Sequence, residues 1–169
     1  MPRRGEFKVS VTKDHLVFAS AHFITFAGHR CEGLHGHNYR ARVTLEGQLD
    51  EDAWFVFDFV IIKKIMKQLC DEIDHKVLLA LDNPKLQVTE QGDSVAVAYE
   101  GQPRYLFPRK DCALLSIPNT TVEMLAELLT TRLRGELEKM GARGLTAIEM
   151  EVEENFGQSA VYRAALGSR

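Results

Sequence analysis

Alternating apolar and polar side chains predict β-strands near both ends of the chain. The clearest alternation covers residues 39–45 and has the period of two that a half-buried strand requires. Its apolar members are Tyr39, Ala41, Val43 and Leu45. The same alternation covers residues 7–11 and 148–152, an apolar stretch covers 16–23, and a last strand is expected over 160–166.

Two other stretches have the three- and four-residue spacing of amphipathic helices. Asp58 precedes the first helix and can cap its first turn. The second begins near Thr120, which with Glu123 fits a capping box, and ends at Gly141. The apolar positions are Ile62, Met66, Leu69 and Ile73 in the first helix and Leu125, Leu129, Leu133 and Leu137 in the second.

The region between the two helices, residues 83–118, has alternating apolar positions and turn signals, which predict an inserted β-hairpin or a three-stranded excursion. The order of elements favours an α+β fold: an antiparallel sheet with both helices on one face, in a single domain over residues 1–169. No glycine-rich phosphate loop follows a strand, which disfavours a doubly wound nucleotide-binding fold.

Composition and charge exclude several classes of function. The 169 residues are 45% hydrophobic, enough for one core, and 21 basic against 24 acidic residues give a net charge of -3. This charge provides no field for nucleic-acid binding, and no stretch is apolar enough for a membrane span. The N-terminus lacks the apolar region of a secretory signal, so we expect a cytoplasmic protein. Three cysteines argue against a disulfide framework.

Two histidines, His35 and His37, continue the buried side of the strand over residues 39–45. On extended backbone their Cα atoms lie about 6.6 Å apart on one side, so both rings can bind one metal ion. His22, at the end of the preceding strand, can supply a third nitrogen, and three histidines with an open fourth position are typical of catalytic zinc sites. The alternative is a polar strand end beside a hydrogen-bonded core histidine, although inward-facing rings need partners that one metal ion would supply.

Cys31 stands in a stretch of Gly, His, Arg and Glu and not in an apolar run. The nearby His29 and Arg30 would favour a thiolate, which makes Cys31 a candidate base or nucleophile. Asp74 and His75 end the first predicted helix and can relay protons, but a cationic histidine at a helix C-terminus also needs no function.

Glu154 continues the inward side of the strand over residues 148–152. A carboxylate in this position either meets an arginine or accepts hydrogen bonds from the paired N–H donors of a ligand.

Six segments occur together in order along the chain. They are residues 18–22 (Phe-Ala-Ser-Ala-His), 31–39 (Cys-Glu-Gly-Leu-His-Gly-His-Asn-Tyr), 57–59 (Phe-Asp-Phe), 74–75 (Asp-His), 121–123 (Thr-Val-Glu) and 152–154 (Val-Glu-Glu). Over nearly its whole length the chain thus resembles the 6-pyruvoyl-tetrahydropterin synthase and 6-carboxytetrahydropterin synthase family. The resemblance implies a tunnelling fold (T-fold), in which a four-stranded antiparallel sheet carries two helices on one face. It also implies a homo-oligomer, a hexamer built as a dimer of trimers, with active sites between subunits.

The resemblance implies a zinc-dependent lyase that acts on a small molecule, 7,8-dihydroneopterin triphosphate. It assigns His22, His35 and His37 as Zn²⁺ ligands, Cys31 as the proton-abstracting thiol, Asp74 and His75 as its assistants, and Glu154 with Thr121 as the pterin anchor.

The spacing Cys-x-x-x-His-Gly-His resembles that of the bacterial 6-carboxytetrahydropterin synthases of queuosine and deazapurine biosynthesis. The expected products are therefore 6-carboxy-5,6,7,8-tetrahydropterin, acetaldehyde and triphosphate. One alternative is a 6-pyruvoyl-tetrahydropterin synthase, which eliminates triphosphate without cleaving the side chain, and another is a pterin-binding homologue without turnover. The insertion is longer than the family's usual connection, and it can alter the choice of substrate if it reaches over the site.

Overall fold

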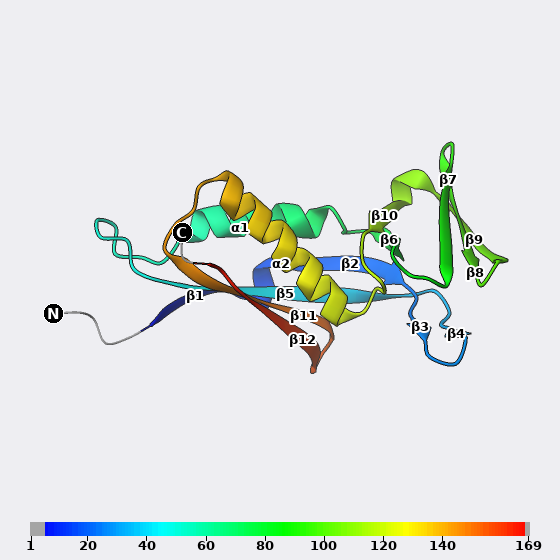
Figure 1. Ribbon diagram of the computed structural model, residues 1–169, viewed down its shortest axis with the longest axis horizontal. Helices are drawn as coiled ribbons and strands as arrows, with labels where there is room; N and C mark the ends of the chain where they lie inside the picture. The colour runs from blue at the N-terminus through cyan, green and yellow to red at the C-terminus, as the bar shows by residue number, and fades with distance from the viewer. Residues whose placement is uncertain (1–5, 168–169) are drawn as a thin grey trace.

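The computed structural model describes residues 6–167, in which two α-helices lie on one face of a curled, mixed β-sheet (Figure 1). The strands follow the order β10-β6-β2-β5-β11-β12, and β1 also pairs with β5. They are β1 (Phe7–Val11), β2 (Val17–His22), β5 (His35–Gly47), β6 (Lys76–Ala80), β10 (Cys112–Leu115), β11 (Leu145–Asn155) and β12 (Gln158–Ala165). The predicted α+β class is found. Four strands, β2-β5-β11-β12, pair antiparallel as predicted, but they form only one side of a larger, mixed sheet, because β6 runs parallel to both β2 and β10.

The long strand β5 organises the sheet, and its pattern of burial is the one predicted. Its apolar residues Tyr39, Ala41, Val43 and Leu45 are at most 1% exposed. They form one side of the core, while β2, β1 and β11 pair along the edges of β5. The buried side of β5 therefore extends from the core to His37 and His35 at the start of the strand.

Helix α1 (Phe59–Asp71) forms as predicted, since the Asp58 side chain accepts a hydrogen bond from the Val60 amide. All four residues of its expected apolar stripe are buried, although Ile73 lies just beyond the last turn. Asp74 and His75 therefore belong to the turn that follows α1, and the prediction that they end the helix is wrong.

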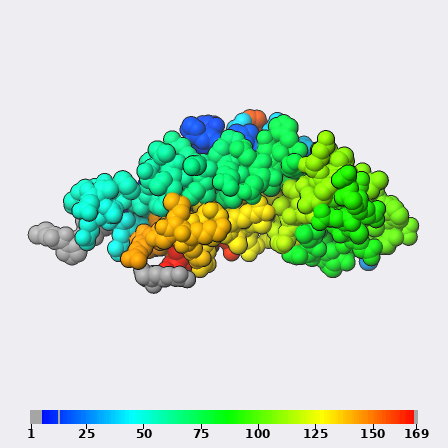
Figure 2. All heavy atoms as spheres, turned by 90° about the horizontal axis from the view of Figure 1, so that it is seen from above, coloured from blue at the N-terminus to red at the C-terminus, as the bar shows by residue number. Residues whose placement is uncertain are grey.

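Helix α2 (Val122–Lys139) buries the four predicted leucines, and Gly141 follows it with a φ of +69°. The predicted capping box is wrong. The N-cap is Thr121, which makes no side-chain capping bond, while the buried Thr120 donates its hydroxyl hydrogen bond to the Phe23 carbonyl. Seen from above, the two helices lie side by side over the sheet (Figure 2). Neither helix in the described part of the chain is long and apolar enough to cross a membrane.

Between the helices, three strands form a separate antiparallel sheet at one end of the molecule (Figures 1 and 2). We call it the insertion sheet: β7 (Leu86–Gln91), β8 (Ser94–Tyr99) and β9 (Gln102–Pro108). The three-stranded form of the predicted excursion is thus the one found, and the remainder of residues 83–118 includes β10, which joins the main sheet.

Three short elements complete the described chain. A two-stranded ribbon, β3 (Thr25–Phe26) and β4 (Arg30–Cys31), follows β2 and carries the predicted catalytic cysteine. Single 3-10 turns occupy Lys13–His15 and Arg109–Asp111. The ribbon lies below the insertion sheet in Figure 1, beyond the end of β2.

Candidate metal centre and active site

The register between β2 and β5 brings the three predicted metal ligands together. His22 is paired with His35 across the two strands, and Ser20 is paired with His37. Gly36, between the two β5 histidines, lies opposite Ala21, and a Cβ atom on it would stand 3.2 Å from the Ser20 carbonyl oxygen. The glycine therefore lets the two strands approach closely at the point where the rings converge.

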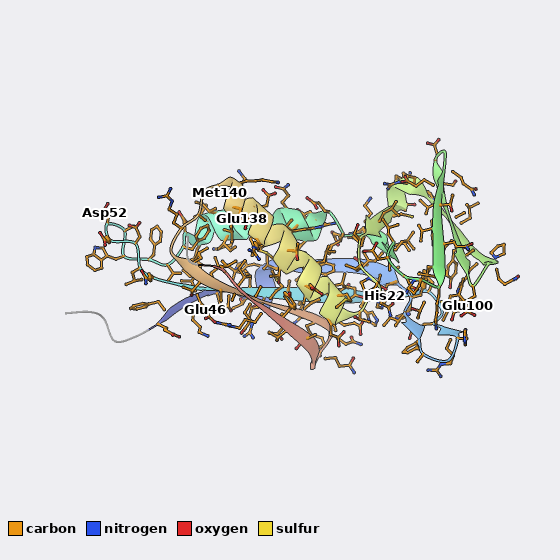
Figure 3. All side chains as sticks on the ribbon, in the orientation of Figure 1. His22, Glu46, Asp52, Glu100, Glu138 and Met140 are labelled. Atoms are coloured by element: carbon orange, nitrogen blue, oxygen red, sulfur yellow. The ribbon has the colours of Figure 1, made fainter. Side chains whose placement is uncertain are left out.

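The rings of His22, His35 and His37 pack edge to face, with centroids 4.7 to 5.3 Å apart. Each offers a nitrogen atom, and all three nitrogens lie within 4.8 Å of one another. Figure 3 shows His22 near the sheet, where the N-terminal end of α2 approaches it. Within the described part of the chain, this is the one group of three or more histidine, cysteine or carboxylate side chains that can hold a metal ion.

The hydrogen bonds of the rings prepare their Nε2 atoms to bind a metal. His22 Nδ1 lies 2.8 Å from the Thr120 carbonyl oxygen and His35 Nδ1 lies 2.9 Å from that of Gly33, so both Nδ1 atoms donate. Each Nε2 atom then carries a lone pair. The His22 ring is fully buried and its Nε2 has no hydrogen-bond partner among the described residues. Burial lowers the pKa of His22, which favours the neutral, ligating form. The residues present therefore fit a metal ion.

Glu154, near the end of β11, faces the same group. Its Oε1 lies 3.3 Å from His22 Nε2 and 3.6 Å from His37 Nε2. Two ligands of one tetrahedral ion with bonds of about 2.0 Å are separated by about 3.3 Å, so the carboxylate stands at ligand spacing. The buried hydroxyl of Tyr39 lies nearby; burial, followed by the charge of Glu154, raises the pKa of Tyr39. Of the two alternatives for this carboxylate, the arginine partner is not found, since the ion pairs of Glu154 within residues 6–167 are with histidines.

Cys31 is half-buried on the β3–β4 ribbon, and its thiol donates to the Glu32 carbonyl oxygen at 3.7 Å. Burial raises the pKa of the thiol above its ordinary value of 9.0, while Arg104 lowers it and Glu32 raises it. The predicted cations are engaged elsewhere: Arg30 lies over the Phe26 ring and His29 pairs with Glu100. The expectation that His29 and Arg30 favour the thiolate is therefore wrong, and the cation that acts on the thiol is Arg104.

Asp74 and His75 form a hydrogen-bonded pair that is fixed to β2. Asp74 Oδ1 accepts from the Ala19 amide at 2.8 Å, and its Oδ2 lies 2.9 Å from His75 Nδ1. His75 has a φ of +55° and an exposed side chain. Ala19 precedes His22 by three strand residues, so the pair lies about 10 Å along β2 from His22, whereas His37 is paired with Ser20, next to Ala19. Cys31 lies beyond the other end of that strand.

Thr121 begins α2, next to the Thr120 carbonyl that fixes His22. The sequence analysis missed Glu32, whose Oε2 lies 3.8 Å from His35 Nδ1 and accepts from the Ile24 amide at 3.4 Å. The signal for Glu32 was its place between Cys31 and the histidine pair. No local pattern points to Arg104, because it reaches the site from the insertion sheet.

The sequence was compared with models of protein families. Residues 10–165 match the model of the family described as 6-pyruvoyl tetrahydropterin synthase. The chain belongs to this family. Among its relatives is a putative 6-carboxy-5,6,7,8-tetrahydropterin synthase of Methanocaldococcus jannaschii. That protein is 38% identical over 151 residues, which cover 89% of this chain and 91% of the relative.

Solved structures of the family have the same fold. The 6-pyruvoyl tetrahydropterin synthase of Plasmodium falciparum superposes with a TM-score of 0.88 at 28% identity, covering 96% of this chain and 100% of that one. A Plasmodium vivax 6-pyruvoyltetrahydropterin synthase matches with a TM-score of 0.87 at 28% identity, covering 96% of this chain and 99% of that one. It is described as a mutant in which a catalytic glutamate is replaced by alanine.

Proposed function

We propose that the protein is a zinc-dependent lyase that converts 7,8-dihydroneopterin triphosphate and one water molecule to 6-carboxy-5,6,7,8-tetrahydropterin, acetaldehyde and triphosphate. The observation that carries the proposal is the convergence of three histidines, one of them with a buried Nε2 that lacks a hydrogen-bond partner. Relatives named 6-carboxy-5,6,7,8-tetrahydropterin synthase support this choice of reaction. The product would serve deazapurine biosynthesis.

His22, His35 and His37 would hold the zinc ion, which when bound polarises the oxygens of the substrate side chain and acidifies the neighbouring C–H bond. Cys31 accepts the proton from that carbon, and the cation that favours its thiolate is Arg104. Glu154 accepts hydrogen bonds from the amino group and adjacent N–H of the pterin ring, beside Thr121. His75, oriented by Asp74, moves a proton as triphosphate leaves and the side chain is cleaved.

The proposal includes a homo-oligomer in which two copies complete each site. Within one chain, the Asp74–His75 pair and Cys31 lie toward opposite ends of β2. We assign the pair that serves each Cys31 to a second copy, in the hexamer of two trimers that the resemblance implies.

A second candidate is 6-pyruvoyl-tetrahydropterin synthase activity, which eliminates triphosphate but keeps the side chain. The family description and the Plasmodium structures carry this name. The assay that separates the two candidates combines protein, zinc and 7,8-dihydroneopterin triphosphate and measures triphosphate, together with acetaldehyde through an aldehyde-oxidising dehydrogenase. Triphosphate without acetaldehyde favours the second candidate. The absence of both products from a preparation with one zinc per chain contradicts both candidates.

Cys31→Ala should lower turnover by about two to four orders of magnitude and leave the zinc content unchanged, because a positioned base is lost. Glu32→Gln is the matched variant, since Glu32 is the other candidate base beside His35. If Cys31→Ala keeps near-normal turnover and Glu32→Gln loses it, the base is Glu32. A His35→Ala, His37→Ala double variant serves as the metal-free control in both experiments.

A further inference from the structure

The insertion sheet lies directly against the segment that carries Cys31. In Figure 1 the β3–β4 ribbon is placed below β8 and β9, and Figure 3 shows Glu100 at their junction. Lys85, just before β7, donates to the Phe26 carbonyl at 3.1 Å. Glu100, in the β8–β9 turn, lies 2.5 Å from His29 Nδ1. The two elements thus meet at strand β3 and at the turn that joins β3 to β4.

Arg104 on β9 contacts the backbone of Cys31 and of the residue that follows it. Its Nη2 donates to the Glu32 carbonyl at 2.7 Å and to the Cys31 carbonyl at 3.3 Å. The Cys31 thiol donates to the same Glu32 oxygen. One carbonyl oxygen therefore joins the guanidinium and the thiol, and the side chain of Arg104 fixes two consecutive peptide groups beside Cys31.

The next residue of β9 extends this attachment toward the metal ligands. The Tyr105 hydroxyl accepts a hydrogen bond from the Leu34 amide at 3.1 Å, one residue before His35. Its ring packs against Phe23, which follows His22, at a centroid distance of 5.3 Å. Arg104 and Tyr105 together bind backbone groups on both sides of Gly33.

The backbone is strained where the ribbon and the insertion sheet meet. His29 and Glu100, which pair with each other, both adopt left-handed conformations, with φ of +58° and +49°. Such a conformation is sterically unfavourable for a non-glycine residue. The ribbon has only two strand residues on each side, and the contacts from the insertion sheet add to the bonds that hold it.

We propose that Arg104 is a positioning residue for the reaction: it holds the Cys31–Glu32 backbone in place and supplies the positive charge beside the thiol. The proposal rests on the proposed function, in which Cys31 is the base. The charged groups that act on the thiol are Arg104 from β9 and Glu32 from the ribbon itself, and the Tyr99 hydroxyl of β8 lies close enough for Cys31 to raise its pKa. Arg104 is the cation of this set.

The first test is alkylation of Cys31 by iodoacetamide, followed by peptide mass spectrometry at a series of pH values. This readout needs no pterin, and the midpoint of the rate against pH reports thiolate formation independently of access. In Arg104→Gln we expect the midpoint to rise by about 0.5 pH unit or more, because a neighbouring cation is lost. Arg104→Lys keeps the charge and should return the midpoint close to the wild-type value. An unchanged midpoint in Arg104→Gln overturns the proposal.

Arg109→Gln is the matched control. Arg109 lies just after β9, pairs with Glu90 and donates to the Cys112 carbonyl. Its replacement by glutamine therefore removes one positive charge near the same sheet but none of the contacts to the ribbon. We expect the single variant Arg104→Gln to lower kcat about tenfold with little change in KM. Arg109→Gln should leave both constants unchanged. An equal fall in both variants would mean that the insertion sheet was only destabilised, and would overturn the role of Arg104.

Tyr105→Phe keeps the ring packing and removes only the acceptor of the Leu34 amide. Hydrogen exchange at that amide should become faster, and kcat should fall less than in Arg104→Gln. Unchanged exchange contradicts the support assigned to β9. If Cys31→Ala retains turnover, the proposed base is wrong, but the alkylation midpoints still decide whether Arg104 acts on the thiol.

Discussion

At the scale of single residues, the Glu154 carboxylate has two candidate partners, a metal ion held by the histidines and the pterin ring of the substrate. Its Oε1 is at ligand spacing from His22 and His37, yet the proposed reaction needs the same group to bind the pterin ring. The two uses are compatible if three histidine nitrogens hold the metal by themselves. The Glu154 carboxylate is then available to accept hydrogen bonds from the pterin ring.

Glu154→Gln should therefore weaken pterin binding by about tenfold or more, because an amide places a donor where the ring also donates and a charge-assisted bond is lost. The zinc content at saturating zinc should stay at one per chain. Fluorescence titration with neopterin and elemental analysis measure the two quantities. Glu149→Gln, at the opposite side of β11, is the control; if both variants bind neopterin as the wild type does, Glu154 is not the anchor.

At the scale of elements, one carboxylate ties three strands of the sheet together. Glu46 on β5 accepts from Lys8 of β1 at 2.7 Å and from Arg163 of β12 at 2.7 Å. The hydrogen bonds from Arg163 and Lys8 lower the pKa of Glu46 from 4.5 to about 2. Because the folded-state pKa is depressed, the stabilisation is fully present above pH 4.5 and is lost as the pH falls toward 2.

Glu46→Gln should reduce the free energy of unfolding at pH 7 by about 1–2 kcal/mol, less than the full pKa shift implies because both cations are partly exposed. Urea unfolding at pH 7, 5, 4 and 3 should show the difference from wild type narrowing below pH 4.5. Glu138→Gln, which removes an exposed pair with Arg134 on α2, should change stability by about 0.5 kcal/mol or less. If the difference in unfolding free energy between Glu46→Gln and the wild type does not change with pH, the depressed pKa assigned to Glu46 is contradicted.

Much of the fold followed from local pattern because its main elements carry their apolar residues on one side only. The β5 strand and both helices have one apolar face, and that face sets a period that sequence alone reveals. Strands β6 and β10 were not predicted, because their sequences lack an alternation of apolar and polar residues. Most of their residues are apolar, as in Val77–Ala80, so no alternation marks them as strands.

The group of histidines that can hold a metal ion could be predicted because the alternation along β5 extends to His35 and His37. The surroundings of Cys31 could not be predicted from neighbours in sequence. His29 and Arg30 are close along the chain, but their side chains pair with Glu100 and Phe26. Arg104, which does act on the thiol, binds backbone carbonyls, and any residue type at those positions would provide the same acceptors.

At the scale of the whole molecule, the separation of Asp74–His75 from Cys31 can be tested in oligomers that contain two different variants. Cys31→Ala and His75→Ala should each be nearly inactive alone. If each site takes Cys31 from one copy and His75 from its neighbour, random assembly of the two variants restores about a quarter of the sites. Co-expression with two different tags, purification through both and the acetaldehyde assay measure this recovery. No recovery in doubly tagged assemblies would place all the groups in one chain.

The glycine between the two β5 histidines also bears on which ion the site prefers. A methyl group on Gly36 would press on the Ser20 carbonyl at 3.2 Å, so β2 and its His22 must retreat by a few tenths of an ångström. Zinc–nitrogen bonds of about 2.0–2.1 Å tolerate changes of only about 0.2 Å. Gly36→Ala should therefore shift selectivity from zinc toward a cation of larger radius, such as cadmium. Competition between the two ions, followed by elemental analysis, measures the shift. Gly33→Ala, where an added methyl meets nothing within 4 Å, should keep the wild-type preference.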